Sequence, residues 1–288
     1  LYSLNNSYGS IAVIFLINKN RMASNNLLYF LLSLIFFTQC KQSEPLPTKY
    51  NLVWSDDFNG SELSQNKWEY MTGDGTQYGI PGWGNNEEQY YRKENVSVSG
   101  GILKIKSIAE NFNGKNYTSA RIRSLNKGDF KYGKIEASLR MSNAGGLWHA
   151  LWMLPSNPSE SWPISGEIDI MEFVGNRSSE IFNTIHFANQ FGAHMQIGET
   201  EPILYDNLFH KYSVEWDANK IVWFMDDVET FKVLRTNSTI ASTWPFDAEF
   251  HLLLNTAVGG NLGGNVSSNT MQTAQFMEVD YVKVYQKK

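Results

Sequence analysis

Short runs of β-branched and aromatic residues recur between residues 50 and 285, separated by clusters of Gly, Asn and Ser. Runs of this length, bounded by turn residues, predict β-strands, and outside residues 27–37 no extended segment shows a clean helical period. Ser99-Gly100-Gly101 and Ala218-Asn219-Lys220 predict hairpin turns. Strands in this number and spacing predict an all-β sandwich. The predicted strands are 96–98, 102–107, 133–141, 147–154, 166–174, 181–187, 211–217, 221–225, 250–257 and 277–285.

One predicted strand, 166–174, carries three carboxylates among its apolar residues. In a regular strand Glu167 and Asp169 share one face and Glu172 points to the other. One inserted residue, a β-bulge, would bring Glu172 back beside the other two. Three carboxylates on one face repel as anions, which favours keeping one of them protonated. A protonated acid beside an ionised carboxylate is the equipment for cleaving a glycosidic bond.

The alternative is an edge strand whose acidic face is simply solvated. Against it, the acids alternate with Ile168, Ile170 and Phe173, and Trp148 and Trp162 lie upstream. Aromatic rings stack on the apolar faces of sugars, so carboxylates among aromatics favour a sugar-binding cleft and a catalytic role.

The composition bounds the function further. The chain has 288 residues, enough for one all-β domain; 14% of them are aromatic, including nine Trp, and only 18% are charged. The net charge is −5 and the sequence has no basic stripe, which excludes nucleic acid as a partner. The single cysteine, Cys40, excludes an internal disulfide and a thiolate metal site.

The apolar run 27–37 has the length of a signal-peptide core and is too short to span a bilayer comfortably. Cys40 follows it, and residues 41–45 are mostly polar. This order is similar to a bacterial lipoprotein signal, in which the cysteine is lipidated and becomes the mature N-terminus. We therefore expect a cell-envelope lipoprotein, at the outer membrane or cell surface. The alternative is a secreted protein whose cysteine is incidental.

These signals divide the chain into a signal segment and linker, residues 1–47, and one folded domain, residues 48–288. Residues 1–21 contain no Met, whereas Met22 stands just before the apolar run. We expect Met22 to be the natural start and residues 1–21 to be translated upstream sequence.

The order of motifs resembles glycoside hydrolase family sixteen, and within it the laminarinases (endo-β-1,3-glucanases). The resemblance covers nearly the whole mature chain, and the Gly-Trp-Gly-Asn-Asn-Glu stretch favours laminarinases over the agarases and carrageenases of the same family. The motifs are WSDDFNG at 54–60, GWGNNE at 82–87, YTSARI at 117–122, GLWHALWML at 146–154, EIDIME at 167–172, NTAVGGN at 255–261 and VDYVKVY at 279–285.

The resemblance implies a concanavalin-like jelly-roll sandwich with a concave substrate cleft and a retaining mechanism that needs no catalytic cofactor. By position, Glu167 is the expected nucleophile and Glu172 the acid/base. Asp169 is expected to hold a proton or a hydrogen bond between them.

The resemblance also implies a set of substrate-binding residues. Asn85 and Arg121 match polar sugar contacts, Trp148 and Trp162 match stacking platforms, and His186 matches a cleft residue near the leaving group. The alternative for the aromatics is core packing, and for His186 a structural role.

Many members of the family bind one structural calcium. The matching positions are the carboxylates of Asp57 and Asp280 and the backbone carbonyl of Gly101, a set of oxygen ligands that suits calcium. The alternative is two surface acids without a metal. The chain also departs from the usual laminarinase pattern: His149 stands where Pro is usual, and Leu262 replaces a Trp.

The leading hypothesis is an endo-acting, retaining hydrolase of β-1,3-glucan, which we expect to be a monomer that meets a membrane only through its lipid anchor. One rival keeps this chemistry on mixed-linkage β-glucan or a marine galactan. The other rival is a non-catalytic glucan-binding protein; relatives of that kind lose the catalytic glutamates, whereas this chain keeps all three acids.

Overall fold

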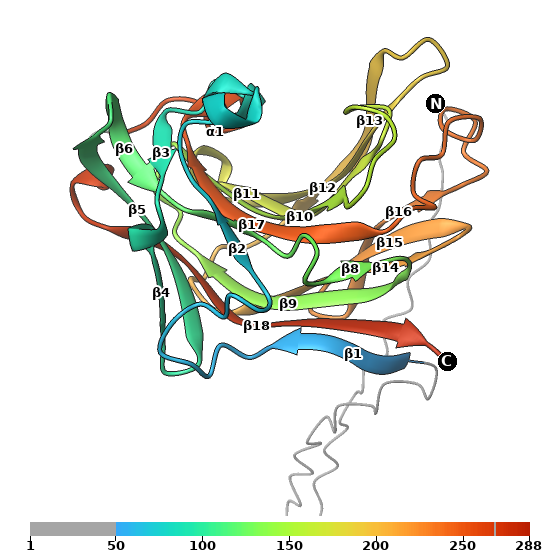
Figure 1. Ribbon diagram of the computed structural model, residues 1–288, viewed down its shortest axis with the longest axis horizontal. Helices are drawn as coiled ribbons and strands as arrows, with labels where there is room; N and C mark the ends of the chain where they lie inside the picture. Colours follow the sequence, from blue (N-terminus) through green and yellow to red (C-terminus); the bar gives the residue numbers. More distant parts are fainter. Residues whose placement is uncertain (1–49, 268) are drawn as a thin grey trace, which may run out of the picture. The chain divides into compact units, whose positions relative to one another are not determined.

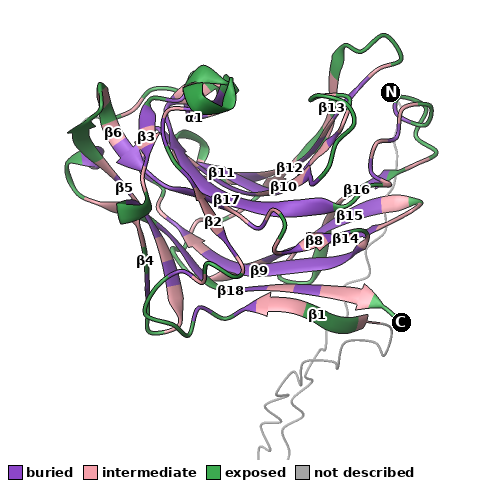
Figure 2. Ribbon diagram, viewed as in Figure 1, coloured by how far each residue is buried: buried purple, intermediate pink, exposed green. Residues whose placement is uncertain are grey.

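The protein is described by a computed structural model that covers residues 50–267 and 269–288. The predicted segment 1–47, with Cys40 and Met22, lies outside the described residues. Within them, two β-sheets pack face to face (Figure 1). Buried residues concentrate on the strands between the two layers, and exposed residues on the loops and outer strands (Figure 2).

The first sheet contains ten of the described strands, in the order β16-β15-β14-β9-β18-β5-β6-β3, with β1 beside β18 and β4 beside β5. Its strands are β1 (Tyr50–Asp56), β3 (Gln89–Tyr91), β4 (Val96–Ser99), β5 (Ile102–Phe112), β6 (Lys115–Ser119), β9 (Gly133–Met141), β14 (His210–Asp217), β15 (Lys220–Met225), β16 (Val228–Leu234) and β18 (Gln275–Lys287).

The second sheet contains eight of the described strands, in the order β13-β12-β11-β10-β17-β7-β2, with β8 beside β17. It curves so that its concave face points away from the first sheet (Figure 1). Its strands are β2 (Glu69–Met71), β7 (Arg121–Arg123), β8 (Asp129–Phe130), β10 (Leu147–Pro155), β11 (Glu167–Val174), β12 (Glu180–Ala188), β13 (His194–Pro202) and β17 (Phe250–Val258).

Helical structure is confined to single turns in the described ranges: the α-helix α1 (Gly260–Gly263) and 3₁₀ turns at Thr76–Tyr78, Pro81–Gly84, Lys93–Asn95, Gly175–Arg177 and Thr270–Gln272. None of these helices has the length and apolar character to cross a membrane.

The sandwich confirms the predicted all-β class, and each predicted strand is present with its ends moved by a few residues. The structure shows which face of the predicted 147–154 strand looks into the core. Leu151 and Met153 of β10 join the core between the sheets, so Trp148 and Trp152 point to the concave face. On the neighbouring strand β11, Ile168 belongs to the same core.

His149, which stands where Pro is usual, lies fully buried in the sandwich. One ring nitrogen lies 2.8 Å from Thr256 Oγ1, and the other lies 2.9 Å from the backbone oxygen of Ser142. A carbonyl only accepts, so Nε2–H donates to Ser142 and Nδ1 accepts from the Thr256 hydroxyl. Burial lowers the His149 pKa to about 4, so the ring is neutral. This residue is structural.

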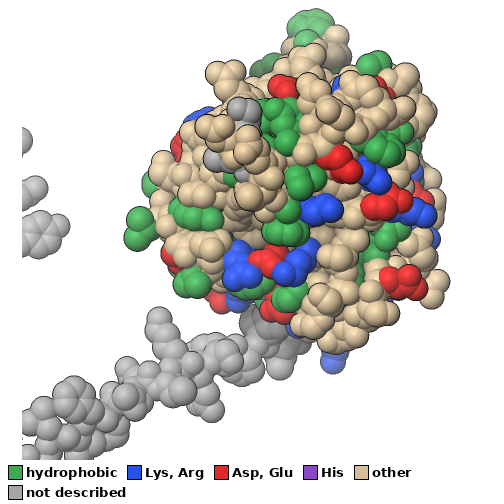
Figure 3. All heavy atoms as spheres, turned by 90° about the vertical axis from the view of Figure 1, so that its left-hand side faces the viewer, with side chains coloured by type: hydrophobic (Ala, Val, Ile, Leu, Met, Phe, Trp, Pro, Cys, Tyr) green, Lys and Arg blue, Asp and Glu red, His purple; other side chains and the backbone are tan. Residues whose placement is uncertain are grey.

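Charged side chains of both signs are interspersed on the face shown in Figure 3, without a continuous basic stripe. Several Lys and Arg side chains pair with acids; Arg92 contacts Glu110 and Lys104 contacts Glu278.

Candidate active site

The predicted β-bulge is present in β11 at the centre of the concave sheet. The register against β10 shifts so that Asp169 and Met171 face consecutive residues and Ile170 is extra; the register against β12 shifts at the same place. Ile170 and Met171 both point into the core. The shift therefore turns Glu172 to the concave face, beside Glu167 and Asp169.

Each glutamate of this trio is oriented by an indole. Trp162 Nε1 donates to Glu167 Oε2 at 2.7 Å, and Trp148 Nε1 donates to Glu172 Oε1 at 2.8 Å. Trp162 is 49% exposed and Trp148 is half-buried, so both rings also present a surface to the concave side. The two indoles therefore fix the carboxyl groups and remain open to a sugar ring.

Asp169 lies between the glutamates and faces β12. One carboxylate oxygen of Glu167, one of Asp169 and one ring nitrogen of His186 all lie within 4.8 Å of one another. His186 Nε2 lies 3.1 Å from Asp169 Oδ2, but the contact is not aligned as a hydrogen bond. Oδ2 of Asp169 consequently has no hydrogen-bond partner among the described residues, although it is buried. This orphaned oxygen is a natural place for a proton.

Burial raises the pKa of all three carboxyls. It raises the pKa of Glu167 to about 8, with the Asp169 charge adding to the effect, and that of Glu172 to about 7. Burial and the Glu172 charge raise the pKa of Asp169 well above its usual range. Because three adjacent carboxyls cannot all ionise readily, the site holds protons at neutral pH.

These shifts predict a pH-dependent stability. A carboxyl whose pKa is raised on folding stabilises the protein below its unfolded pKa and loses that contribution as the pH rises through its folded pKa. For Glu167 the window extends from the ordinary carboxyl pKa of 4.5 to the raised pKa of about 8. We expect Glu167→Gln to raise the melting temperature above that window and to leave it unchanged near pH 4. Thermal melts of both proteins across this range measure it; an equal shift at every pH would contradict the burial of an ionisable Glu167.

Arg121 lies beneath the concave surface and not on it. Its guanidinium is sandwiched at 4.7 Å from the rings of both Trp83 and Trp152, and the residue is 5% exposed. Its positive charge stabilises the ionised carboxylates of Glu87 and Glu167. Arg121 therefore contributes chiefly as a buried positive charge held between two aromatic rings.

Asn85 belongs to a buried polar network that sequence analysis did not foresee. Asn85 is half-buried at the end of a 3₁₀ turn, and its side chain hydrogen-bonds to Glu87. Glu87 Oε2 accepts hydrogen bonds from Gln89 Nε2 at 2.7 Å and from the Tyr91 hydroxyl at 2.9 Å. Asn255 donates to that hydroxyl at 3.2 Å. The network fixes the 82–87 motif against the concave sheet.

The sequence offered one signal for this network, the GWGNNE motif, but it pointed to Asn85 alone. Asn255 accepts from Trp152 Nε1 at 2.8 Å, which connects the network to the face of β10 that also carries Trp148. Tyr91 and Asn255 belong to strands far apart in the chain, so their hydrogen bond depends on the sheet topology.

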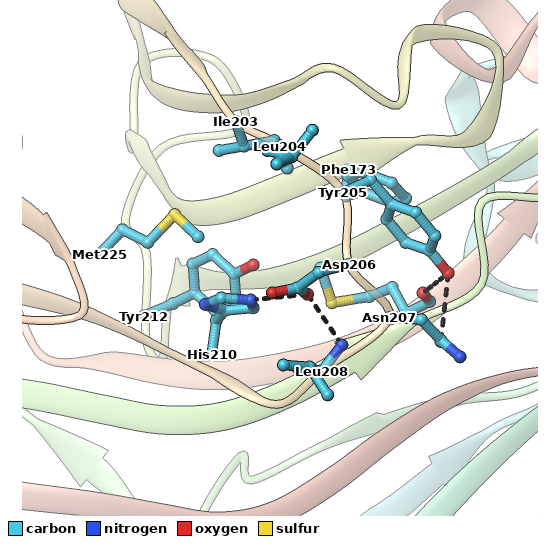
Figure 4. Close-up of a pocket in the computed structure, with 11 residues that line it drawn as sticks. Phe173, Ile203, Leu204, Tyr205, Asp206, Asn207, Leu208, His210, Tyr212 and Met225 are labelled. Atoms are coloured by element: carbon cyan, nitrogen blue, oxygen red, sulfur yellow. Dashed lines mark hydrogen bonds and ion pairs between the residues drawn. The ribbon is translucent and has the colours of Figure 1, made fainter.

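The structure also contains a small cavity away from the carboxylates, between β14 and the 203–208 loop (Figure 4). Asp206 accepts from the Leu208 amide and pairs with His210 across it. The cavity has a volume of about 20 Å³, which is close to that of a single water site and too small for a sugar.

The three positions predicted to hold calcium belong to β18 and to the chain next to β1 and β5, which both pair with β18. The backbone oxygen of Asp57 faces the α-carbon of Gly101. Asp280 is the extra residue of a bulge in β18. Its neighbour Val279 pairs with Leu103 of β5, the strand that begins directly after Gly101. Lys283 Nζ lies 3.4 Å from the Asp57 carboxylate and competes with a cation for it. Strand pairing thus brings the three residues to neighbouring positions of the first sheet.

Comparison with known proteins decides the family. The model of glycosyl hydrolases family 16 matches residues 84–283. The chain belongs to this family. It is therefore a glycoside hydrolase, as the resemblance predicted, and its two sheets form the jelly-roll sandwich of that family.

The family 16 chain is similar to enzymes that act on β-glucans. It is 37% identical over 254 residues to a beta-glucanase of Rhodothermus marinus, covering 82% of this chain and 85% of the relative. It is 35% identical over 266 residues to glucan endo-1,3-beta-glucosidase A1 of Niallia circulans, covering 84% of this chain but only 39% of that longer protein. The laminarinase catalytic domain from Thermotoga maritima superposes with a TM-score of 0.76 at 35% identity, over 83% of this chain and 99% of that domain.

Proposed function

We propose that the protein is an endo-acting, retaining hydrolase of β-1,3-glucan, of the laminarin type. The observation that carries the proposal is the bulge in β11, which sets Glu167, Asp169 and Glu172 on one concave face with an indole N–H on each glutamate. Relatives named for β-glucan hydrolysis support the choice of substrate.

In the first step, Glu167 as a carboxylate attacks the anomeric carbon while Glu172 gives its proton to the departing glycosidic oxygen. The bond from sugar to leaving group breaks, and a bond from sugar to Glu167 forms. The Trp162 N–H holds Glu167 for the attack, and the Arg121 charge favours its ionised form. A proton on Asp169 removes one negative charge from between the two glutamates.

In the second step, Glu172, now a carboxylate, takes a proton from water as the water oxygen attacks the anomeric carbon. The bond to Glu167 breaks and its carboxylate is regenerated. Two inversions leave the product in the configuration of the substrate. The chain's own residues perform both steps without a cofactor.

A panel of polysaccharides tests the substrate assignment. We expect purified protein to release oligosaccharides from laminarin faster than from lichenan, with no products from agarose or carrageenan. Hydrolysis confined to lichenan or to a galactan would overturn the β-1,3-glucan assignment. Binding to laminarin without any hydrolysis would favour the glucan-binding alternative.

We also propose a structural calcium between Asp57, Gly101 and Asp280, away from the carboxylates. The ion would stabilise the junction of β1, β5 and β18 because it would tie together three strands that are distant in sequence. We expect calcium to raise the melting temperature of wild-type protein and to have no such effect on Asp280→Ala, measured against samples in chelator. An equal rise for both proteins would exclude this site.

We propose, finally, that Cys40 is lipidated and holds the enzyme at the bacterial envelope. Support comes from the sequence, because Cys40 is the sole thiol and stands between an apolar signal core and a polar linker. Acyl chains contribute about 0.8 kcal/mol per buried CH₂ group, so several chains on one cysteine anchor firmly. We expect Cys40→Ser to move the protein from the membrane to the soluble fraction with its hydrolytic activity intact. A wild-type protein that is already soluble would favour ordinary secretion.

A further inference from the structure

A second histidine stands behind His186 at the edge of the active site. His186 on β12 and His194 at the start of β13 belong to one hairpin, and their rings lie nearly parallel, edge to edge, with centroids 5.1 Å apart. Nδ1 of His186 lies 2.9 Å from Nε2 of His194. The His194 ring also packs on Trp162, with centroids 4.7 Å apart, and one side of it is exposed. His194 therefore touches both the imidazole beside Asp169 and the indole that holds Glu167.

The short nitrogen–nitrogen distance requires one proton between the two rings, because a neutral imidazole has one donor and one acceptor. The other nitrogen of His186, Nε2, faces the buried and unpartnered Oδ2 of Asp169 at 3.1 Å. Nε2 of His186 can accept a hydrogen bond from a protonated Oδ2 of Asp169 only if Nε2 itself carries no proton. A small rotation of either side chain aligns this hydrogen bond. His186 must then carry its own proton on Nδ1 and donate it to His194.

We propose that His194 is a positioning residue: by accepting the Nδ1 proton of His186, it keeps Nε2 of His186 free to accept the proton of Asp169. The importance of that proton rests on the function proposed above, in which Asp169 separates the nucleophile from the acid/base. The chain Asp169–His186–His194 also connects the buried acid to solvent, because His194 is exposed.

Loss of His194 has a defined electrostatic consequence. Without an acceptor at Nδ1, His186 can carry its proton on Nε2 and donate it to an ionised Asp169. An ionised Asp169 raises the pKa of both Glu167 and Glu172, because like charges disfavour each other. Among the described residues, the ionisable groups around the histidine pair are these three acids of β11, with Arg121 acting on Glu167. Both limbs of the pH–rate profile should therefore move to higher pH.

Two substitutions separate the hydrogen bond from the packing. His194→Phe keeps a ring on Trp162 but has no acceptor, whereas His194→Gln loses the ring but offers an amide oxygen to Nδ1 of His186. On laminarin at neutral pH we expect His194→Phe to lower kcat about tenfold, as a pKa displacement of one unit would, with little change in KM. His194→Gln should restore most of the wild-type pH profile. The reverse order, with Phe active and Gln impaired, would show that His194 acts only by packing.

Imidazole ¹⁵N spectra test the proton position without relying on activity. We expect His186 in the wild type to carry its proton on Nδ1, and in His194→Phe to carry it on Nε2. A wild-type His186 protonated on Nε2 overturns the inference even if the enzyme hydrolyses laminarin. A wild-type protein that shows the Nδ1 tautomer but hydrolyses no glucan would instead contradict the proposed function alone.

Discussion

Glu167→Gln abolishes the hydrolysis of β-1,3-glucan if Glu167 forms the covalent intermediate. An amide cannot attack the anomeric carbon, and removing a nucleophile lowers kcat by at least about 10⁴-fold. The amide can still accept a hydrogen bond from Trp162 Nε1 through its oxygen, so the site keeps its shape. Initial rates of reducing-sugar release from laminarin measure the effect.

The matched control is Glu62→Gln, the same chemical change at an exposed residue in the loop after β1. It should hydrolyse laminarin at the wild-type rate. Both variants should bind laminarin, because neither change removes an aromatic surface. Product formation by Glu167→Gln within about tenfold of the wild type would assign the nucleophile to another residue.

Glu172→Ala separates the acid/base from the nucleophile. Glucan has a poor leaving group that needs a proton, so we expect kcat to fall by about 10²–10⁴-fold. In an aryl glycoside with an acidic phenol, the phenolate departs without that proton. Formation of the glycosyl–enzyme from such a substrate should therefore be nearly unaffected. The glycosyl–enzyme then accumulates because no base activates water.

Azide distinguishes this account from loss of folding. The truncated side chain leaves a space next to the Trp148 N–H, where a small anion can reach the anomeric carbon. Added azide should restore turnover of the aryl glycoside and give a glycosyl azide of retained configuration. An azide of inverted configuration would mean that no covalent intermediate forms on Glu167.

The carboxylate trio could be predicted from the sequence because the bulge follows from local pattern. Ile170 and Met171 are consecutive apolar residues, and both occupy the core. A strand that buries two neighbours in succession must shift its register, which returns Glu172 to the face of Glu167. The six adjacent residues supply the acids and the apolar pair, and the structure shows that both members of the pair enter the core.

The partners of the trio could not be predicted in the same way. The pairing of His186 with His194 depends on β13, an edge strand with only Met195 and Ile197 packed on the core, too weak a pattern to identify. Arg121 was expected as a sugar contact, and its burial between Trp83 and Trp152 comes from three separate strands or turns. Contacts across the sheet are fixed by register and topology, which local periodicity does not contain.

The anomeric configuration of the first product tests the central claim most directly. Wild-type protein should be mixed with laminarin and followed by ¹H NMR, before mutarotation equilibrates the new reducing ends. Two displacements, with Glu167 as nucleophile, predict that β-anomer signals appear first and α-anomer signals follow slowly. If α-anomer signals appear first, water attacks the substrate directly, and the covalent role of Glu167 is wrong.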